Sequence, residues 1–241
     1  MLERFDALPA KDRVIVALDC GASEALALAD KLIGKATWLK IGMTLYYAEG
    51  PSIIEALKRR GFKVFLDLKF HDIPHQVAGA AASAVKSGAD MVTMHAVGGV
   101  AMMVAAQKAV EAAADDTGDA APITLGITVL TSMDQTTLAA TGVNRTVTEQ
   151  VCSLAAQAQD AHLSGVVASP QEAALLRDLL GPQAFIVTPG VRPAGVSLGD
   201  QSRVATPAQA FAAGASHIVI GRPITQATDP VEAFETITKG L

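Results

Sequence analysis

Residues 63–77, KVFLDLKFHDIPHQV, contain the clearest indication of fold in the chain. The first seven, KVFLDLK, are mainly apolar, which is typical of a strand buried on both faces of a parallel sheet. The next segment, VAGAAASAVKSG (77–88), has small and apolar residues at helical spacing and ends in glycine, as helix stops often do. The sequence therefore predicts a strand followed directly by a helix.

The same strand-like pattern recurs along the whole chain. Together with residues 63–69, it predicts eight strands, at VIVALD (14–19), TWLKIG (37–42), KVFLDLK (63–69), DMVTMH (90–95), ITLGITVL (123–130), GVVAS (165–169), AFIVTPG (184–190) and HIVIG (217–221). Helical patterns lie between them, for example at 23–34, 51–61, 171–181 and 207–215. Alternation of this kind over 241 residues predicts a single α/β domain spanning residues 1–241, a (β/α)₈ TIM barrel.

A doubly wound open sheet is the competing fold. Such sheets usually carry a G-x-G-x-x-G turn after the first strand, and VIVALDCGAS (14–23) lacks it. The barrel is therefore the favoured prediction.

Composition excludes several classes of function. The 19 Lys and Arg against 24 Asp and Glu give a net charge of −5, which disfavours a nucleic-acid partner. No apolar run approaches the roughly 18 residues needed to span a membrane, and the polar start does not resemble a signal peptide. The two cysteines show no metal or redox spacing. We expect a reduced, cytoplasmic protein.

Polar residues close most of the predicted strands. In a (β/α)₈ barrel, the carboxyl ends of the strands form the working face. The residues at or just beyond these ends are Asp19, Lys40, Asp67, Lys69, Asp72, His95, Thr131, Ser132, Ser169, Arg192, Gly221 and Arg222. Scattered surface charges would not favour strand ends so consistently.

Side-chain alternation refines this prediction. Residues two apart on a strand share a face, so Asp67 and Lys69 should point together into the barrel mouth, with Leu66 and Leu68 toward the helices. The alternative is an ordinary surface ion pair. Buried charges stabilise a fold little even when paired, so a neutral set of Lys40, Asp67, Lys69 and Asp72 is better explained by function.

The D-x-K-x-x-D-I-P pattern at 67–74 resembles the signature of the orotidine 5′-monophosphate decarboxylase family. The resemblance extends from ALD (17–19) to IGRPI (220–224) and includes LKIG (39–42), VLTSMD (129–134) and VTPGVRP (187–193). It implies a bacterial-type enzyme that converts orotidine 5′-monophosphate (OMP) to uridine 5′-monophosphate (UMP) and CO₂ in pyrimidine biosynthesis. The resemblance also implies that no metal or other cofactor takes part.

The resemblance further implies roles for individual residues. Lys69 would stabilise the carbanion at C6 and then protonate it, and Asp67 would lie near the departing carboxylate. Lys40 would hold Asp67 and reach the ribose, whose hydroxyls Asp19 would contact. Asp72 would reach across from the partner subunit, which implies a homodimer with shared active sites.

The other substrate contacts implied by the family lie further along the chain. Thr131 and Ser132 would contact the pyrimidine, and Gln76 is a further substrate-binding residue. Arg192, Gln201, Gly221 and Arg222 would bind the phosphate, and the 192–203 loop resembles the family's lid. These residues complete the expected binding site for a small-molecule nucleotide.

Two other functions stay open at this point. Relatives with the same D-x-K-x-x-D barrel act on sugar phosphates with Mg²⁺, which an acidic residue on the second strand helps to hold. Lys40 occupies that strand here and would repel the metal. The other possibility is a non-catalytic barrel that only binds a phosphorylated ligand. A barrel that only binds a ligand has no reason to bury two lysines and two aspartates beside one another.

Overall fold

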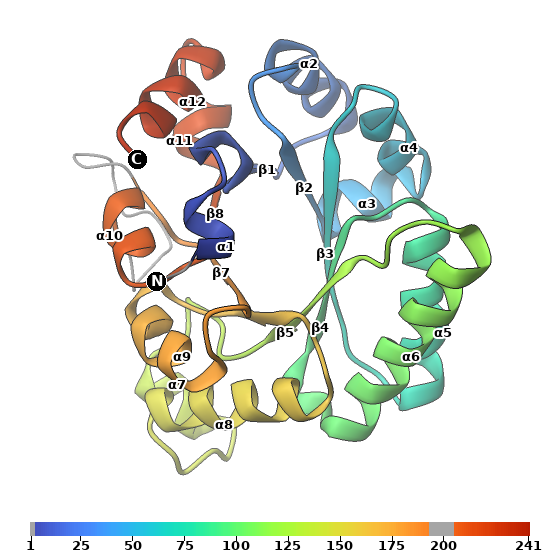
Figure 1. The fold of residues 1–241 in the computed structure, drawn as a ribbon, viewed down its shortest axis with the longest axis vertical. Coiled ribbons are helices and arrows are strands. Elements are labelled where there is room, and N and C mark those ends of the chain that lie inside the picture. The colour runs from blue at the N-terminus through green and yellow to red at the C-terminus, as the bar shows by residue number, and fades with distance from the viewer. Residues whose placement is uncertain (1–2, 193–204) are drawn as a thin grey trace.

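Eight parallel strands pair in sequence order and close into a barrel, because β8 pairs with β1 (Figure 1). A computed structural model describes residues 3–192 and 205–241. The strands are β1 (Val14–Leu18), β2 (Trp38–Gly42), β3 (Lys63–Phe70), β4 (Met91–His95), β5 (Ile123–Ile127), β6 (Gly165–Val167), β7 (Phe185–Thr188) and β8 (His217–Ile220). All eight predicted strands are confirmed, most of them a residue or more shorter than expected.

Helices separate the strands and surround the barrel (Figure 1). The α-helices are α1 (Glu3–Asp6), α2 (Ala22–Leu32), α3 (Met43–Glu49), α4 (Ser52–Lys58), α5 (Pro74–Lys86), α6 (Val100–Thr117), α7 (Gln135–Ala140), α8 (Val147–Asp160), α9 (Ala173–Leu180), α10 (Pro207–Ala212), α11 (Arg222–Thr225) and α12 (Pro230–Lys239). Three short 3₁₀ turns are η1 (Ala10–Asp12), η2 (Ala96–Gly98) and η3 (Pro170–Glu172). None of the described helices is both long enough and apolar enough to span a membrane.

The strands bury both of their faces. Outward residues such as Leu66 and Leu68 pack with the helices in one large apolar cluster. Inward residues such as Ile15, Trp38 and Phe65 form a separate cluster inside the barrel. The predicted alternation of faces is therefore confirmed, and the barrel interior is filled with side chains up to its carboxyl end.

An irregularity interrupts this alternation at the end of β3. Leu66 pairs with Val92 and Phe70 pairs with Met94, so β3 advances four residues while β4 advances two. Lys69 lies within this bulge and has a φ of 55°, in the left-handed region that non-glycine residues rarely adopt. Regular alternation, which the sequence argument assumed, does not extend to Lys69.

Aromatic side chains close the opposite, amino-terminal end of the barrel. Phe5 of α1 packs edge-on against Phe185, with their ring centroids 5.1 Å apart, and Arg4 stacks on both rings. The His217 ring lies 5.6 Å from Phe185 and is almost fully buried. This end of the barrel is therefore packed, and the functional site must lie at the other end.

Acid should destabilise the fold through His217. Burial, followed by the charges of Arg13, Lys63 and Arg4, lowers the pKa of this imidazole to about 3. The unfolded chain, with an ordinary pKa near 6.5, binds the proton more readily, so stability falls as pH drops from about 6.5 toward 3. We expect a loss on the order of 2 kcal/mol between pH 7 and pH 5 from this group.

Denaturant unfolding of the protein and of His217→Phe at pH 7 and pH 5 would measure this contribution. Phenylalanine keeps the aromatic packing but has no proton to bind, so the variant should lose less stability on acidification. An equal loss in both proteins would show that His217 is not the responsible group.

Candidate active site

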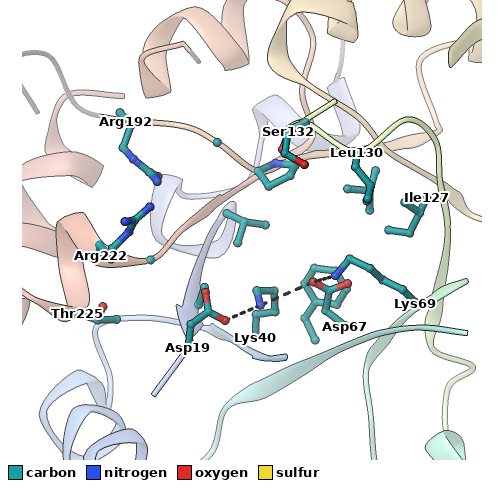
Figure 2. Close-up of a pocket in the computed structure, with 18 of the residues that line it drawn as sticks. Asp19, Lys40, Asp67, Lys69, Ile127, Leu130, Ser132, Arg192, Arg222 and Thr225 are labelled. Carbon is teal, nitrogen blue, oxygen red and sulfur yellow. Dashed lines mark hydrogen bonds and ion pairs between the residues drawn. The ribbon is translucent and has the colours of Figure 1, made fainter. Parts of the chain in front are cut away.

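A cavity of about 680 Å³ opens at the carboxyl ends of the strands, as predicted for this fold. Figure 2 shows part of its lining. The residues that surround it come from the ends of β1, β2, β3, β5, β6, β7 and β8 and from the segments that follow them. Nine predicted site residues are among them: Asp19, Lys40, Asp67, Lys69, Thr131, Ser132, Arg192, Gly221 and Arg222.

Four charged side chains of alternating sign lie in series at the base of this cavity (Figure 2). Lys69 Nζ donates to Asp67 Oδ2 over 2.8 Å, and Lys40 Nζ lies 3.7 Å from the same oxygen. Lys40 Nζ also donates to Asp19 Oδ1 over 3.1 Å. The order Asp19, Lys40, Asp67, Lys69 thus places each ammonium group against at least one carboxylate, which offsets part of the cost of burial.

Asp67 is at the centre of this series and is held in its charged form. Burial alone would raise its pKa, but the charges of Lys40 and Lys69 and hydrogen bonds from Lys69 and Thr93 outweigh burial and lower it. Lys40 is only 8% exposed. A preorganised array whose Asp67 and Lys40 are largely withdrawn from water is suited to stabilising charge that develops on a bound substrate.

Gly42 gives the Asp19–Lys40 pair the space it needs. A Cβ atom at this position would lie 3.2 Å from both Asp19 Oδ1 and Lys40 Nζ, closer than most such contacts. A larger residue at position 42 would therefore push the Asp19 or Lys40 side chain aside by a few tenths of an ångström. The contact between Asp19 and Lys40 therefore explains why a glycine ends the LKIG motif.

Two arginines line the side of the cavity away from Lys69 (Figure 2). Arg192 follows β7, and Arg222 follows β8 directly after Gly221. Guanidinium groups bind phosphate with paired donors, and barrels commonly bind phosphate after their seventh and eighth strands. The cavity therefore has two guanidinium groups on one side and a separate charge series at its base.

The segment after β5 forms another wall. Ile127, Val129 and Leu130 contribute apolar surface to the cavity, and Thr131 and Ser132 contribute hydroxyl groups. An apolar wall with a few polar groups is typical of sites that bind a planar organic ring. Thr131 and Ser132, which the sequence predicts to contact a pyrimidine, thus both lie in the cavity wall.

Three predicted site residues are not among the described residues that line this cavity. Asp72 and Gln76 are exposed, one just after β3 and one in the first turn of α5. The Asp72 carboxylate accepts a hydrogen bond from the Ile73 amide. Gln201, with residues 193–203 of the predicted lid, lies outside the described residues. A single chain thus gathers three members of the predicted neutral set, Lys40, Asp67 and Lys69.

The described residues provide no cluster of three or more His, Cys, Asp or Glu side chains that could hold a metal ion. His71 and His95 lie close together, with ring centroids 5.5 Å apart. Burial, then the charges of His71 and Lys69, lowers the pKa of His95, which favours its neutral form.

Sequence reasoning missed a residue that hydrogen-bonds to the charge series, Thr93. This threonine is fully buried on β4, and its hydroxyl lies 3.0 Å from Asp67 Oδ1. Its position two residues before His95 was the available signal, because residues two apart on a strand share a face. A threonine in an apolar strand is common enough that composition alone did not single it out.

Known proteins of similar sequence and structure show which family the chain belongs to. Residues 12–237 match the model of the orotidine 5′-phosphate decarboxylase / HUMPS family. Orotidine 5′-phosphate decarboxylases from Moorella thermoacetica and Alkalilimnicola ehrlichii are 48% and 49% identical, over 98% and 95% of this chain and 94% and 96% of their own lengths. A crystal structure of that enzyme from Lactobacillus acidophilus superposes with a TM-score of 0.85 at 38% identity, covering 95% of this chain and 98% of that one. The chain therefore belongs to the orotidine 5′-phosphate decarboxylase / HUMPS family.

Proposed function

We propose that this protein decarboxylates OMP to UMP and CO₂, the reaction for which its relatives are named. The observation that supports this most strongly is the Lys40–Asp67–Lys69 cluster at the base of a cavity that carries two arginines on its far side. This arrangement fits a nucleotide, which carries its reacting ring at one end and its phosphate at the other.

The chemistry explains why a charge cluster is needed. When the bond between C6 and the carboxyl carbon breaks, CO₂ leaves and the electron pair stays on C6 in an orbital that the ring cannot delocalise. Lys69, which is paired with Asp67, would stabilise this carbanion electrostatically and then transfer a proton from Nζ to C6. Solvent would reprotonate the lysine after release of UMP.

Asp67 and Lys40 would prepare Lys69 for this step. Asp67 would lie near the departing carboxylate while its charge offsets the cost of burying both ammonium groups. Lys40, which contacts both aspartates, would orient Asp67 and reach the ribose, whose hydroxyls Asp19 would bind. The four side chains act as one array, because each is fixed by its neighbour.

The phosphate would contribute binding energy at a distance from the reacting carbon. Arg192 and Arg222 would bind it, and Gly221 would let the backbone approach, while Thr131 and Ser132 contact the ring. Energy from a remote group can be used to orient and desolvate the reacting end of a substrate. Gln201 and Gln76 are proposed to add substrate contacts.

A spectrophotometric assay with OMP in excess chelator tests both the reaction and its metal independence. We expect full turnover, because the chain's own ammonium groups supply the positive charge. Loss of activity on chelation, restored by Mg²⁺, would instead favour a metal-dependent sugar-phosphate enzyme of the same family. Absence of turnover under any condition would overturn the proposed function.

We further propose a homodimer with shared active sites. Exposed apolar side chains follow three adjacent strands at the carboxyl end: Met43 and Tyr47 after β2, Ile73 after β3 and Val97 after β4. Asp72 adjoins Ile73 in this group. Neighbouring apolar side chains at one end of a barrel favour association with another copy, which would bring Asp72 to the partner's site.

Mixing two inactive variants tests the sharing of sites. In a mixed dimer of Lys69→Ala and Asp72→Asn chains, one site would combine an intact Lys69 with an intact Asp72 from the partner. Unfolding and refolding an equimolar mixture should therefore restore about a quarter of the normal activity. No restoration, despite dimers in sedimentation, would mean that Asp72 does not act across the interface.

A further inference from the structure

Thr93 occupies a singular position opposite the bulge in β3. Because the strand register skips there, residues 67–69 all stand opposite this single residue of β4. Its side chain points toward the barrel axis and is fully buried. The bulge also takes the Lys69 amide out of the regular ladder, which would leave a buried donor in need of an acceptor.

The Thr93 hydroxyl makes two hydrogen bonds that connect both charged residues of the bulge. The Lys69 backbone N–H donates to Thr93 Oγ1 over 2.9 Å, and Oγ1 donates to Asp67 Oδ1 over 3.0 Å. A hydroxyl has a single proton, so accepting from the amide leaves that proton for the carboxylate. The two bonds run in one direction and strengthen each other.

We propose that Thr93 is a positioning residue for the decarboxylation proposed above, because its hydroxyl fixes the Lys69 backbone and the Asp67 carboxylate relative to each other. This inference rests on the proposed function. Thr93 is not among the residues that line the cavity, so it would not contact the substrate.

The hydroxyl acts on both ends of the Asp67–Lys69 pair. Thr93 holds Oδ1, which turns the other oxygen, Oδ2, toward Lys69 Nζ at 2.8 Å and Lys40 Nζ at 3.7 Å. It also stabilises the left-handed backbone of Lys69, a conformation that is unfavourable for a non-glycine residue. Without the hydroxyl, the Asp67 carboxylate would be free to rotate, and Lys69 Nζ would no longer be held in one orientation.

Valine at position 93 removes the hydroxyl while keeping the shape of the side chain. We expect Thr93→Val to lower kcat for OMP by about 10- to 100-fold, the usual effect of losing one hydrogen bond to a charged group, with little change in KM. Thr93→Ser retains the hydroxyl and should restore most of the activity. A split between kcat and KM, with rescue by serine, separates positioning from a general loss of folded protein.

The pH dependence of kcat/KM distinguishes positioning from a purely structural role, because a structural role would leave it unchanged. Asp67 is faced by Lys40 from β2, Lys69 from β3 and His95 and Thr93 from β4. The Thr93 hydrogen bond helps to lower the pKa of Asp67, so its removal should raise that pKa. The acidic limb of kcat/KM should therefore move to higher pH in Thr93→Val and return in Thr93→Ser.

Thr124→Val is the matched control. Thr124 is equally buried on the neighbouring strand β5, and its hydroxyl bonds to Gln107, away from Asp67. This control should lose some stability, while its kcat and pH profile should stay normal. If Thr93→Val does not fold, Thr93→Cys, whose thiol is a weak donor, should shift the acidic limb in the same direction.

The outcomes separate this inference from the proposed function. Turnover of OMP by the unmodified protein, together with normal kcat and an unshifted acidic limb in a folded Thr93→Val or Thr93→Cys, would overturn the positioning role alone. Absence of turnover by the unmodified protein would overturn the proposed function itself.

Discussion

Replacing Lys69 with alanine is expected to lower kcat by about four orders of magnitude or more, while UMP still binds measurably. The reason is that one side chain would serve both as the proton donor and as the nearest positive charge to the carbanion, and each role alone is worth about 10²–10⁴-fold. Single-turnover kinetics with OMP and a separate binding titration with UMP would measure the two effects.

Lys58→Ala is a suitable control. Lys58 also pairs with an aspartate, Asp90, at 2.7 Å, but neither residue lines the cavity. This variant should turn over OMP at close to the normal rate. A Lys69→Ala enzyme with near-normal kcat would remove Lys69 from the reaction. A protein that bound UMP but never turned over OMP, even unmodified, would fit a non-catalytic binding barrel instead.

Arg222→Ala should produce the second large effect, and only on substrates that carry a phosphate. Truncating one partner of a close charge pair usually costs about 2–5 kcal/mol, so kcat/KM for OMP should fall by about 30- to 5,000-fold. Orotidine, the nucleoside without phosphate, should react poorly but equally with both enzymes. Comparing kcat/KM for the two substrates isolates the contribution of the phosphate.

Arg59→Ala provides the control for this second prediction, because Arg59 is exposed and lies outside the cavity. Its kcat/KM should be unchanged for both substrates. If Arg222→Ala lowered the rate with orotidine as much as with OMP, the arginine would act on the reacting ring rather than on phosphate. Unchanged kcat/KM for OMP would remove Arg222 from the site.

The barrel could be predicted from sequence because its signals are local. Each strand is a short apolar run, and each helix has apolar residues at helical spacing. The carboxyl ends of all parallel strands lie at the same end of the barrel. The inward placement of Asp67 followed from alternation with Leu66 and Leu68. The two arginines and Gly221 were predicted because they follow the last two strands.

Contacts between strands were harder to predict, because they depend on register. The bulge that gives Lys69 its left-handed backbone is set by how β3 pairs with β4, and a single strand does not encode it. The same is true of Thr93, whose two hydrogen bonds reach residues 24 and 26 positions away. The direct Asp19–Lys40 pair was likewise not predicted, since only the register of β1 and β2 brings the two residues together.

Some expectations concern a partner subunit, residues outside the described ranges, or properties that one chain's structure does not test. The roles of Asp72 and Gln76, the homodimer and the contribution of Gln201 stay predictions, as do the single-domain span of residues 1–241 and the cytoplasmic location. A residue that acts in a partner's site must be exposed on its own chain, and Asp72 is exposed beside the apolar Ile73. The mixed-dimer experiment tests whether Asp72 acts in this way.

A crystal structure with bound UMP would test most directly whether the charge cluster and the arginines serve one substrate. We expect the phosphate against Arg192 and Arg222, and C6 of the uracil ring beside Lys69 Nζ, with Asp67 next to the space that the departing carboxylate would have occupied. UMP bound with its ring away from Lys69, or with its phosphate away from both arginines, would contradict this account.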